Sequence, residues 1–276
     1  EADVHEAVHD VRKRCKKIRA AWRLIRDDLG GAAYQERNEW YRDTARLLSD
    51  MRDAKAMLET TALLRNYFGD LVYKKAFDEL QQAFEDRLKR YEADHEAEVP
   101  ERIHKATERL ETAVESLNPI QEDADNWERV VHSLRRVYKR GYRAFQKAGQ
   151  AADPEVIHEW RKRTKYLRYQ LRLLKRVWPG MINPWREELH RLSDLQGDHH
   201  DLHELKIRLP ALEEVDGLTR ESIEALAGKH QDWLYQKMLP LGHRLYVETP
   251  DAFASRMHGY LRAWEGHGQD AVPVSV

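Results

Sequence analysis

The stretch HDVRKRCKKIRAAWRLIR, from His9 to Arg26, decides the fold of this chain because two helical stripes run through it. The first stripe is an apolar seam with heptad spacing that comprises Val8, Val11, Cys15, Ile18, Trp22, Ile25 and Leu29. The second stripe is a basic row, shifted by one residue, that comprises His9, Arg12, Lys16, Arg19, Arg23 and Arg26. Steps of three and four residues place each stripe on one face of a helix. We therefore predict a helix that packs by its seam and presents the basic row beside it.

The same pattern returns 149 residues later in HEWRKRTKYLRYQLRLLK, from His158 to Lys175. Matching positions often hold identical residues, as with His9 and His158 or Arg12 and Arg161. The apolar seam of this copy comprises Ile157, Trp160, Thr164, Leu167, Leu171, Leu174 and Trp178. Its basic row comprises His158, Arg161, Lys165, Arg168, Arg172 and Lys175. The sequence thus predicts two similar helices, one in each half of the chain.

A second pair of motifs follows the first pair. LLSDMRDAKAM, which holds Asp50 and Asp53, matches LQGDHHDLHEL, which holds Asp198 and Asp201, at nearly the same offset. Paired motifs on successive helices argue against the alternative that all helices rich in lysine and arginine look alike. We predict a single domain over 1–276, made of an N-terminal helical bundle repeat over 1–149 and a C-terminal one over 150–276.

Composition favours an all-α fold. Of the 276 residues, 41% are hydrophobic, which is enough for a core, while glycine and proline are sparse. Periodicity, capping residues and breaks predict helices over 4–28, 32–66, 71–95, from Pro100 to the break at Asn118-Pro119, 123–148, from the Asp153-Pro154 cap to 178, 184–209, 219–227, 230–247 and 250–264. We expect the tail over 266–276 to be frayed.

Cellular location is constrained only indirectly by the sequence. No apolar run is long enough to span a membrane, and the first residues lack the apolar stretch and the basic start of a signal peptide. Cys15 is the only cysteine, so an internal disulfide is excluded. These features fit a reducing cytoplasm, which we take as the expected location.

The net charge of −1 hides a strong segregation of charge along the chain. The two repeated stretches are basic, whereas 78–128 and 187–232 are rich in carboxylates. Solvated helix faces usually mix signs, and like charges three or four residues apart cost roughly 0.2–0.5 kcal/mol per pair. A bound polyanion would offset that cost. The alternative, which stays open here, is that carboxylates on neighbouring helices neutralise the rows.

The form of the rows indicates the kind of polyanion. A row that extends over several helical turns suits a long anion better than a compact mononucleotide. The sequence also lacks the GxxxxGK[ST] loop that cradles nucleotide phosphates. Arginine binds phosphate oxygens in pairs and lysine supplies point charge, so a linear phosphate polymer is the favoured ligand. Single-stranded RNA, or another nucleic-acid backbone, is the alternative. Because Trp22, Trp160 and Trp178 lie on the seams, we expect them in the core and not in contact with bases.

A third basic segment runs through 132–147, and we expect it to add a further wall to the binding surface. Its cations, His132, Arg135, Arg136, Lys139, Arg140 and Arg143, spread over a wider face than either row. We expect its aromatic residues Tyr138, Tyr142 and Phe145 to lie in the core.

Asp198, His199, His200, Asp201 and His203 raise the question of a metal, since His199 and His203 are four residues apart. The first repeat has aspartates but no histidines at the matching positions, so we interpret Asp50, Asp53, Asp198 and Asp201 as residues that fix the bundle by pairing with arginine. We therefore expect no metal and no cofactor.

Phosphotransfer from a histidine would not need two matched rows, and the carboxylate-rich ExExK motif of triphosphate tunnel enzymes is absent. We expect the protein not to be an enzyme.

VHDVRKRCKKIRAAWRLIR and IHEWRKRTKYLRYQLRLL resemble the paired histidine-bearing signatures of the CHAD domain, the conserved histidine α-helical domain. LLSDMRDAKAM and LQGDHHDLHEL are similar to the motif after each signature, and GHRLYVETPDAFASRMHGYLRAW to the family's C-terminal helices. The resemblance implies two four-helix bundles related by a pseudo-twofold axis. It also implies binding of inorganic polyphosphate at a central basic surface, with association with polyphosphate granules as a further expectation.

The resemblance, taken residue by residue, implies polyphosphate contacts at His9, Arg12, Lys16, Lys17, Arg19, Arg23, His158, Arg161, Lys165 and Arg168. The repeat and the third basic segment add Lys13, Lys162, Arg172, Arg135, Lys139 and Arg143 to these candidates. Tyr166 replaces the residue that matches Lys17, and His203 stands opposite Lys55, so the two halves are expected to differ in binding.

Overall fold

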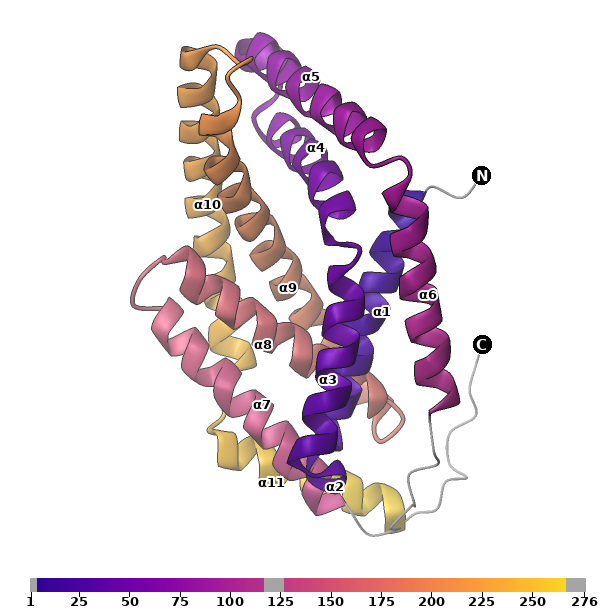
Figure 1. The fold of residues 1–276 in the computed structure, drawn as a ribbon. Helices are drawn as coiled ribbons and strands as arrows, with labels where there is room; N and C mark the ends of the chain where they lie inside the picture. The colour runs from indigo at the N-terminus through magenta and orange to yellow at the C-terminus, as the bar shows by residue number, and fades with distance from the viewer. Residues whose placement is uncertain (1–3, 117–126, 267–276) are drawn as a thin grey trace. The chain divides into compact units, whose positions relative to one another are not determined.

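The computed structural model describes residues 4–116 and 127–266, with only the backbone described at 51–54 and 70–72. Every regular element in these ranges is a helix, and no strand occurs in them. Figure 1 shows the helices in chain order. They are α1 (Val4–Leu24), α2 (Arg26–Leu29), α3 (Gly31–Arg46), α4 (Ser49–Phe68), α5 (Asp70–Asp94), α6 (Glu98–Glu115), α7 (Trp127–Ala148), α8 (Pro154–Leu173), α9 (Pro179–Arg208), α10 (Gly217–Leu245) and α11 (Pro250–Gly266), with a 3₁₀ turn at Leu209–Ala211. The predicted all-α fold is confirmed.

The chain folds into two compact units, each assembled from separate segments. Unit 1 comprises 1–16, 40–120 and 197–236, and unit 2 comprises 17–39, 121–196 and 237–276, each within the described ranges. Each unit takes segments from both halves of the sequence, so the units differ from the repeats predicted over 1–149 and 150–276. The duplication into two four-helix bundles stays a prediction.

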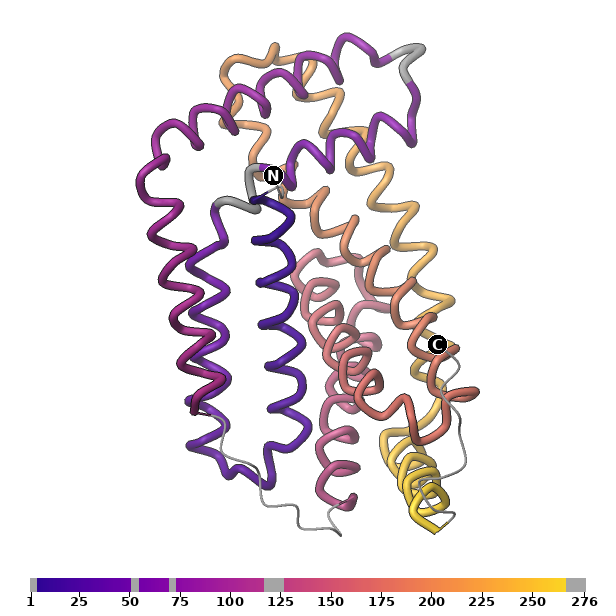
Figure 2. The backbone as a smooth tube through the Cα atoms, turned by 90° about the vertical axis from the view of Figure 1, so that its right-hand side faces the viewer, coloured from indigo at the N-terminus to yellow at the C-terminus, as the bar shows by residue number. Residues whose placement is uncertain are grey.

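In unit 1, α4 and α5 pack against each other as neighbouring helices (Figure 2). The first part of α1 meets α6 and the start of α4 in an apolar cluster of Val8, Leu48 and Ala106. In unit 2, α7 packs against α8, α11 and the short α2 (Figure 1). The carboxamide of Gln170 on α8 donates to the Ala20 carbonyl at 3.3 Å and so ties α8 to the end of α1.

The apolar seams lie in the core, as predicted. Val8, Cys15 and Trp22 of α1 are buried, and Val11 and Ile18 are partly buried. The last two seam residues, Ile25 and Leu29, lie in the turn and in α2 and are also partly buried. On the second seam, Ile157, Trp160, Thr164, Leu167, Leu171 and Leu174 are all buried. Trp178 was wrongly predicted to join them. Because α8 ends at Leu173, the helical register that would carry Trp178 into the core is lost, and its side chain is 48% exposed.

Two predicted helices are broken where the sequence has no proline or glycine. The helix predicted over 32–66 divides into α3 and α4 at Leu47–Leu48. Leu48 turns into the core, and its carbonyl accepts a 2.9 Å hydrogen bond from Arg12. An arginine side chain thus satisfies a backbone acceptor at the break. The helix predicted over 4–28 divides at Ile25 into α1 and α2, and Gly30, at φ 77°, ends α2.

Two other predicted boundaries were wrong because tertiary packing carries a helix through a weak position. Pro184 does not begin a helix but lies inside α9, which starts at Pro179. The proline is only about one turn into that helix, so few backbone hydrogen bonds are lost. Likewise α10 runs continuously past Gly228, where two helices were predicted, since the neighbouring Ala227 and His230 are buried.

Other helix ends agree with the sequence analysis. Asp153 caps α8, and its carboxylate accepts hydrogen bonds from the backbone of Glu155 and Val156, with Pro154 in the first turn. The predicted break at Asn118-Pro119, the helix start at 123 and the tail from 267 onward lie outside the described residues. None of the described helices is both long enough and apolar enough to cross a membrane.

Gly242 allows close helix packing in unit 2. A Cβ at this position would overlap the rings of Phe145 and Trp160, whose centroids lie 5.2 Å apart. Around this contact Tyr138 and Phe145 are buried, as predicted, and Tyr142 is half-buried. The joint of α7, α8 and α10 therefore requires glycine.

Replacing Gly242 with alanine should destabilise the protein by roughly 1–3 kcal/mol through overpacking. Gly259 on α11 is the matched control, because nothing lies within 4 Å of a Cβ placed there. Its replacement with alanine should stabilise the protein by about 0.5–1 kcal/mol. Urea denaturation of the two variants measures both effects. Equal effects on the free energy of unfolding would contradict the close packing described here.

Two buried histidines in unit 1 make stability depend on pH. Burial, with nearby His203, His200 and Lys206, lowers the pKa of His199 to about 4, and burial lowers the pKa of His230 as well. In the unfolded chain both titrate near ~6.5 and take up protons first. The contribution of the two neutral histidines to the free energy of unfolding is therefore fully present above that pH and falls as the pH drops toward 4.5.

Thermal unfolding between pH 7 and 5 should show this decline in stability, and the double variant His199→Gln/His230→Gln should flatten it. Replacing the exposed His104 with glutamine should leave the slope unchanged.

Candidate anion-binding site

The basic row of α1 divides between the two units. In unit 1 it holds His9 and Lys16, which are exposed, and Arg12, which is half-buried, as is the neighbouring Lys13. Arg12 donates to the Leu48 carbonyl at 2.9 Å, so this predicted contact residue also has a structural role. The row thus presents charge at its ends, while its middle helps to hold the fold.

In unit 2 the row continues as Arg19, Arg23 and Arg26, which are half-buried, as is the neighbouring Lys17. Neutral groups hold these arginines in place. The Asn38 carboxamide oxygen accepts hydrogen bonds from Arg19 at 3.1 Å and from Arg23 at 3.3 Å. Because an amide oxygen carries no net charge, it orients the two guanidinium groups without neutralising them.

Aromatic rings lie against the same arginines. The Arg23 guanidinium lies 4.0 Å from the centroid of the Tyr166 ring, and the Arg26 guanidinium lies 4.7 Å from that of Tyr34. Tyr166 is the residue that departs from the basic pattern in the second copy. Its ring stabilises a cation through a cation–π contact instead of supplying a charge. The difference between the two halves therefore has a structural consequence at Arg23.

The row on α8 lies entirely in unit 2. Five of its side chains are half-buried or exposed: His158, Arg161, Lys165, Arg168 and Arg172. The flanking Lys162, also a predicted contact residue, pairs with Glu159 at 3.4 Å, and Arg163 pairs with the same carboxylate. Burial raises the pKa of Glu159, but these two cations outweigh burial and hold that pKa below its usual value.

The positive charges of four other arginines act on Arg140 of α7. Burial and the positive charges of Arg163, Arg23, Arg26 and Arg136 lower the pKa of Arg140. These five residues, which we call the arginine cluster, come from α1, α2, α7 and α8. Such mutual repulsion is unfavourable unless negative charge balances it.

Carboxylates balance only part of the arginine cluster. Asp27 pairs with Arg136 at 3.1 Å and with His132 at 2.7 Å, and these contacts outweigh burial and lower the pKa of Asp27. Glu159 pairs with Arg163. No carboxylate within the described parts of the chain forms an ion pair with Arg23, Arg26 or Arg140. Among the described residues, three positive charges are thus left without a partner carboxylate.

A second group of arginines in unit 2 comes from α8 and from the first turns of α9. Burial and the charges of Arg172 and Arg168 lower the pKa of Arg186. Arg186 donates to the Asn183 side chain at 2.7 Å, again a neutral acceptor. Arg168 lies 5.2 Å from the ring centroid of Tyr169. This group repeats, on a smaller scale, the arrangement of the arginine cluster.

The third basic segment on α7 divides into two faces. Arg136 and Arg140 belong to the arginine cluster. Arg135 instead pairs with Asp251 at 2.5 Å, an acid from α11 far along the sequence. Lys139 is half-buried and Arg143 is exposed. Internal pairing therefore accounts for Arg135, whereas contacts of Lys139 and Arg143 with a polyanion stay predictions.

The remaining motif residues are part of unit 1. Among the described side chains, no group of three or more histidine, cysteine or carboxylate residues could hold an ion. Asp50 pairs with Arg102 at 3.3 Å, which agrees with its predicted role in fixing the bundle. The side chain of Asp53 lies outside the described residues.

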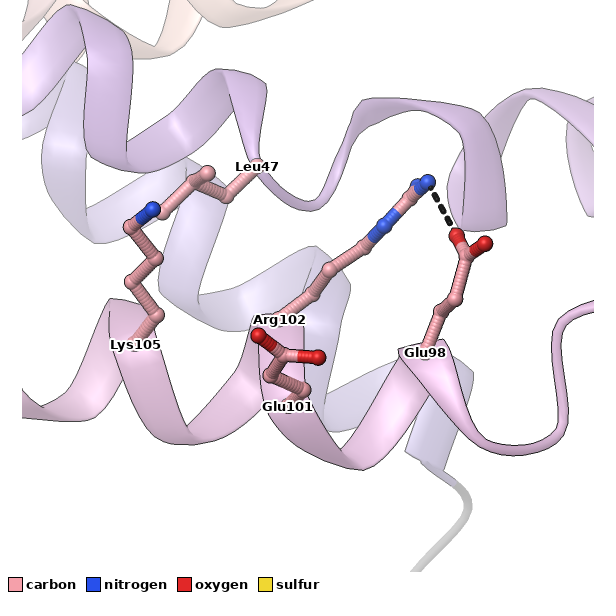
Figure 3. A pocket seen from close by; sticks show the side chains of 5 residues that line it. All are labelled: Leu47, Glu98, Glu101, Arg102 and Lys105. Atoms are coloured by element: carbon pink, nitrogen blue, oxygen red, sulfur yellow. Dashed lines mark hydrogen bonds and ion pairs between the residues drawn. The ribbon is translucent and has the colours of Figure 1, made fainter.

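Figure 3 shows an open pocket of about 300 Å³ in unit 1, lined by Leu47, Glu98, Glu101, Arg102 and Lys105. Arg102 points toward Glu98 and binds it at 2.7 Å. Two carboxylates and two cations share this lining, so its charges balance. The pocket is therefore less suited to a polyanion than the arginine cluster.

The sequence analysis missed several residues of the site. Arg163, Arg26 and Arg186 were not among the predicted contacts. For two of them a signal was present, because Arg26 is the last step of the first row and Arg163 has an identical counterpart in Arg14. Arg186, on a different helix, had no such signal. Asn38 had none either, since its role depends on folding α3 back against α1.

Comparison with known proteins agrees with the basic architecture. The profile of the CHAD domain family matches residues 1–210, which is most of the chain. Neither the curated proteins nor the solved structures gave a significant match. Paired basic signatures, an all-helical fold and the profile match together show that this chain belongs to the CHAD domain family, whose members bind inorganic polyphosphate.

Proposed function

We propose that this chain binds inorganic polyphosphate, without catalysis, through the basic rows of α1 and α8. The observation that carries the proposal is the arginine cluster. Arg23, Arg26 and Arg140 lie together without carboxylate partners among the described residues, which is costly for a protein that binds nothing there. A phosphate chain would supply the missing charge.

The rows suit a polymer because they continue along helices. Arginine can donate two parallel hydrogen bonds to one phosphate, and lysine can follow a mobile chain as a point charge. The neutral Asn38 and tyrosine rings already orient Arg19, Arg23 and Arg26, so less side-chain entropy is lost on binding. In cells, such binding would recruit the protein to polyphosphate granules.

A nucleic-acid backbone is the alternative ligand. Proteins that bind single strands usually stack bases on exposed aromatic rings. Trp22 and Trp160 are buried, and guanidinium groups lie against Tyr34 and Tyr166. Trp178 is exposed, and its ring stacks edge-on with Tyr260 at 4.8 Å between centroids. The rows therefore offer many phosphate contacts and few surfaces for bases, which favours polyphosphate.

The double variant Lys16→Glu/Arg172→Glu should lose roughly 100-fold in affinity for long-chain polyphosphate, about tenfold for each reversed phosphate contact. Both positions are exposed, so the fold should persist. Lys229→Glu/Arg244→Glu is the matched control, with the same change in net charge at exposed positions outside the rows. Fluorescence anisotropy with labelled polyphosphate measures both. Equal losses would show a general charge effect and contradict binding at the rows.

Polyphosphate affinity should also fall steeply with salt. If five phosphates are neutralised, the logarithm of the affinity should fall with the logarithm of the salt concentration with a slope of about −3 to −4. The Lys16→Glu/Arg172→Glu variant should give a slope shallower by at least about 1. A slope near zero for the unmodified protein would rule out a polyphosphate contact of this extent.

A further inference from the structure

We propose that the turn between α8 and α9 (Figure 1) is a membrane-docking surface that attaches unit 2 to a bilayer containing anionic lipids. The surface comprises Leu173 at the end of α8, Lys175, Arg176 and Trp178 in the turn, and Met181 in the first turn of α9. We call these five residues the basic–apolar turn. None of them belongs to the arginine cluster, and the proposal does not depend on polyphosphate binding.

The apolar side chains of the basic–apolar turn face solvent. Leu173 is 53% exposed, and Met181 is 47% exposed. Their neighbours Leu174 and Ile182 are buried, so the core of unit 2 holds the chain on both sides of the turn. A single exposed apolar residue is common on protein surfaces. Three large ones over 173–181, with Trp178 as the third, are not used by the core and indicate a binding surface.

Trp178 is held in a defined orientation within this stretch. Its ring packs edge-on against Tyr260 of α11 at 4.8 Å between centroids, and the Arg256 guanidinium lies 5.4 Å from the centroid of the Tyr260 ring. The indole combines an apolar ring with an N–H donor, and tryptophan is enriched where the hydrocarbon of a membrane meets water. Trp178 is therefore suited to anchor the turn at the level of lipid headgroups.

The charge along this part of the chain is positive. The sequence has no aspartate or glutamate over 160–186. Lys175 and Arg176 are exposed, and neither pairs with a carboxylate in the parts of the chain that the structure describes. The exposed Trp233 of unit 1 differs, because its neighbour Asp232 is an exposed acid. Anionic headgroups attract lysine and arginine near the membrane surface, so charge complementarity favours an anionic bilayer.

A bilayer suits this combination of side chains better than a polyphosphate chain or a protein. Polyphosphate would contact the cations and leave the apolar side chains in water. A stable protein interface takes about 20–30 residues from each partner, far more than this one turn offers. A lipid surface needs no matching shape, and two weak signals, apolar insertion and charge, together give stable attachment. Because α8 ends at Leu173, Lys175 departs from the basic row and lies in the turn instead.

The test measures co-sedimentation of the protein with vesicles at low salt and without polyphosphate. Vesicles of phosphatidylcholine with about 30% phosphatidylserine should bind the protein much more tightly than phosphatidylcholine alone. Leu173→Ser/Met181→Ser should lower the partition coefficient at least about tenfold. This variant retains Trp178, and an unchanged Tm checks that it is folded. The matched control Ile207→Ser/Leu218→Ser changes two exposed apolar residues of unit 1 and should bind like the unmodified protein.

A second variant tests the contribution of charge. Lys175→Gln/Arg176→Gln should weaken binding to the anionic vesicles about tenfold, and added salt should reduce its difference from the unmodified protein. The matched control Lys74→Gln/Lys75→Gln removes a pair of exposed cations from unit 1 and should leave vesicle binding unchanged. Equal losses in these two variants would show a general effect of net charge and contradict docking by the turn.

Other outcomes would also overturn the proposal. The first is an unmodified protein that does not bind anionic vesicles. The second is a change from dimer to monomer in Leu173→Ser/Met181→Ser, measured by light scattering, since the turn would then be an interface between copies. Polyphosphate affinity of this variant should stay within about twofold of the unmodified value, and its loss would assign the turn to the polyphosphate site. Vesicle binding without any polyphosphate binding would instead overturn only the proposed function.

Discussion

Repulsion among the guanidinium groups around Arg140 is the constraint to which much of unit 2 responds. Like charges separate unless stronger forces hold the elements that carry them. Here the buried seam of α8, with Trp160 and Leu167, provides that force, and Gly242 lets a third helix pack closely against it. Burial of a large apolar side chain contributes about 1.5–3 kcal/mol, several times the cost of one like-charge pair. The core can therefore maintain a cluster that is itself unfavourable.

Many of the other cations are neutralised, which makes the cluster distinctive. Arg135 pairs with Asp251, and Arg129 pairs with Asp28. Arg12 binds a backbone carbonyl. The two interpretations of the basic residues, internal ion pairing and charge left for an anion, thus suit different residues. Internal pairing explains many of the flanking cations, whereas at the centre of the cluster the partners are amides and rings. Under the proposed function, a polyanion would balance the charge there and not along every basic segment.

The sequence predicted much of the fold because helix formation and helix burial are governed by local periodicity. The seams, the Asp153 cap and the positive-φ glycine after α2 were all predicted from local periodicity and helix-end residues. The break at Leu48 was not, because it depends on a carbonyl meeting Arg12 from a distant part of the chain. Nor was the exposure of Trp178, since α8 ends before the heptad pattern does. Continuity across Pro184 and Gly228 also reflects packing and not local preference.

By itself the sequence determined that the chain is helical, that each signature helix carries an apolar seam beside a basic row, and that α8 begins at Asp153-Pro154. These properties follow from the spacing of residues a few positions apart. Tertiary structure alone decided which cations are neutralised and which gather. Asp251 meets Arg135, Asn38 meets Arg23, and Tyr166 lies against a guanidinium from the other half of the chain. Electrostatic energy depends on distance in space, and only folding sets that distance between residues far apart in sequence.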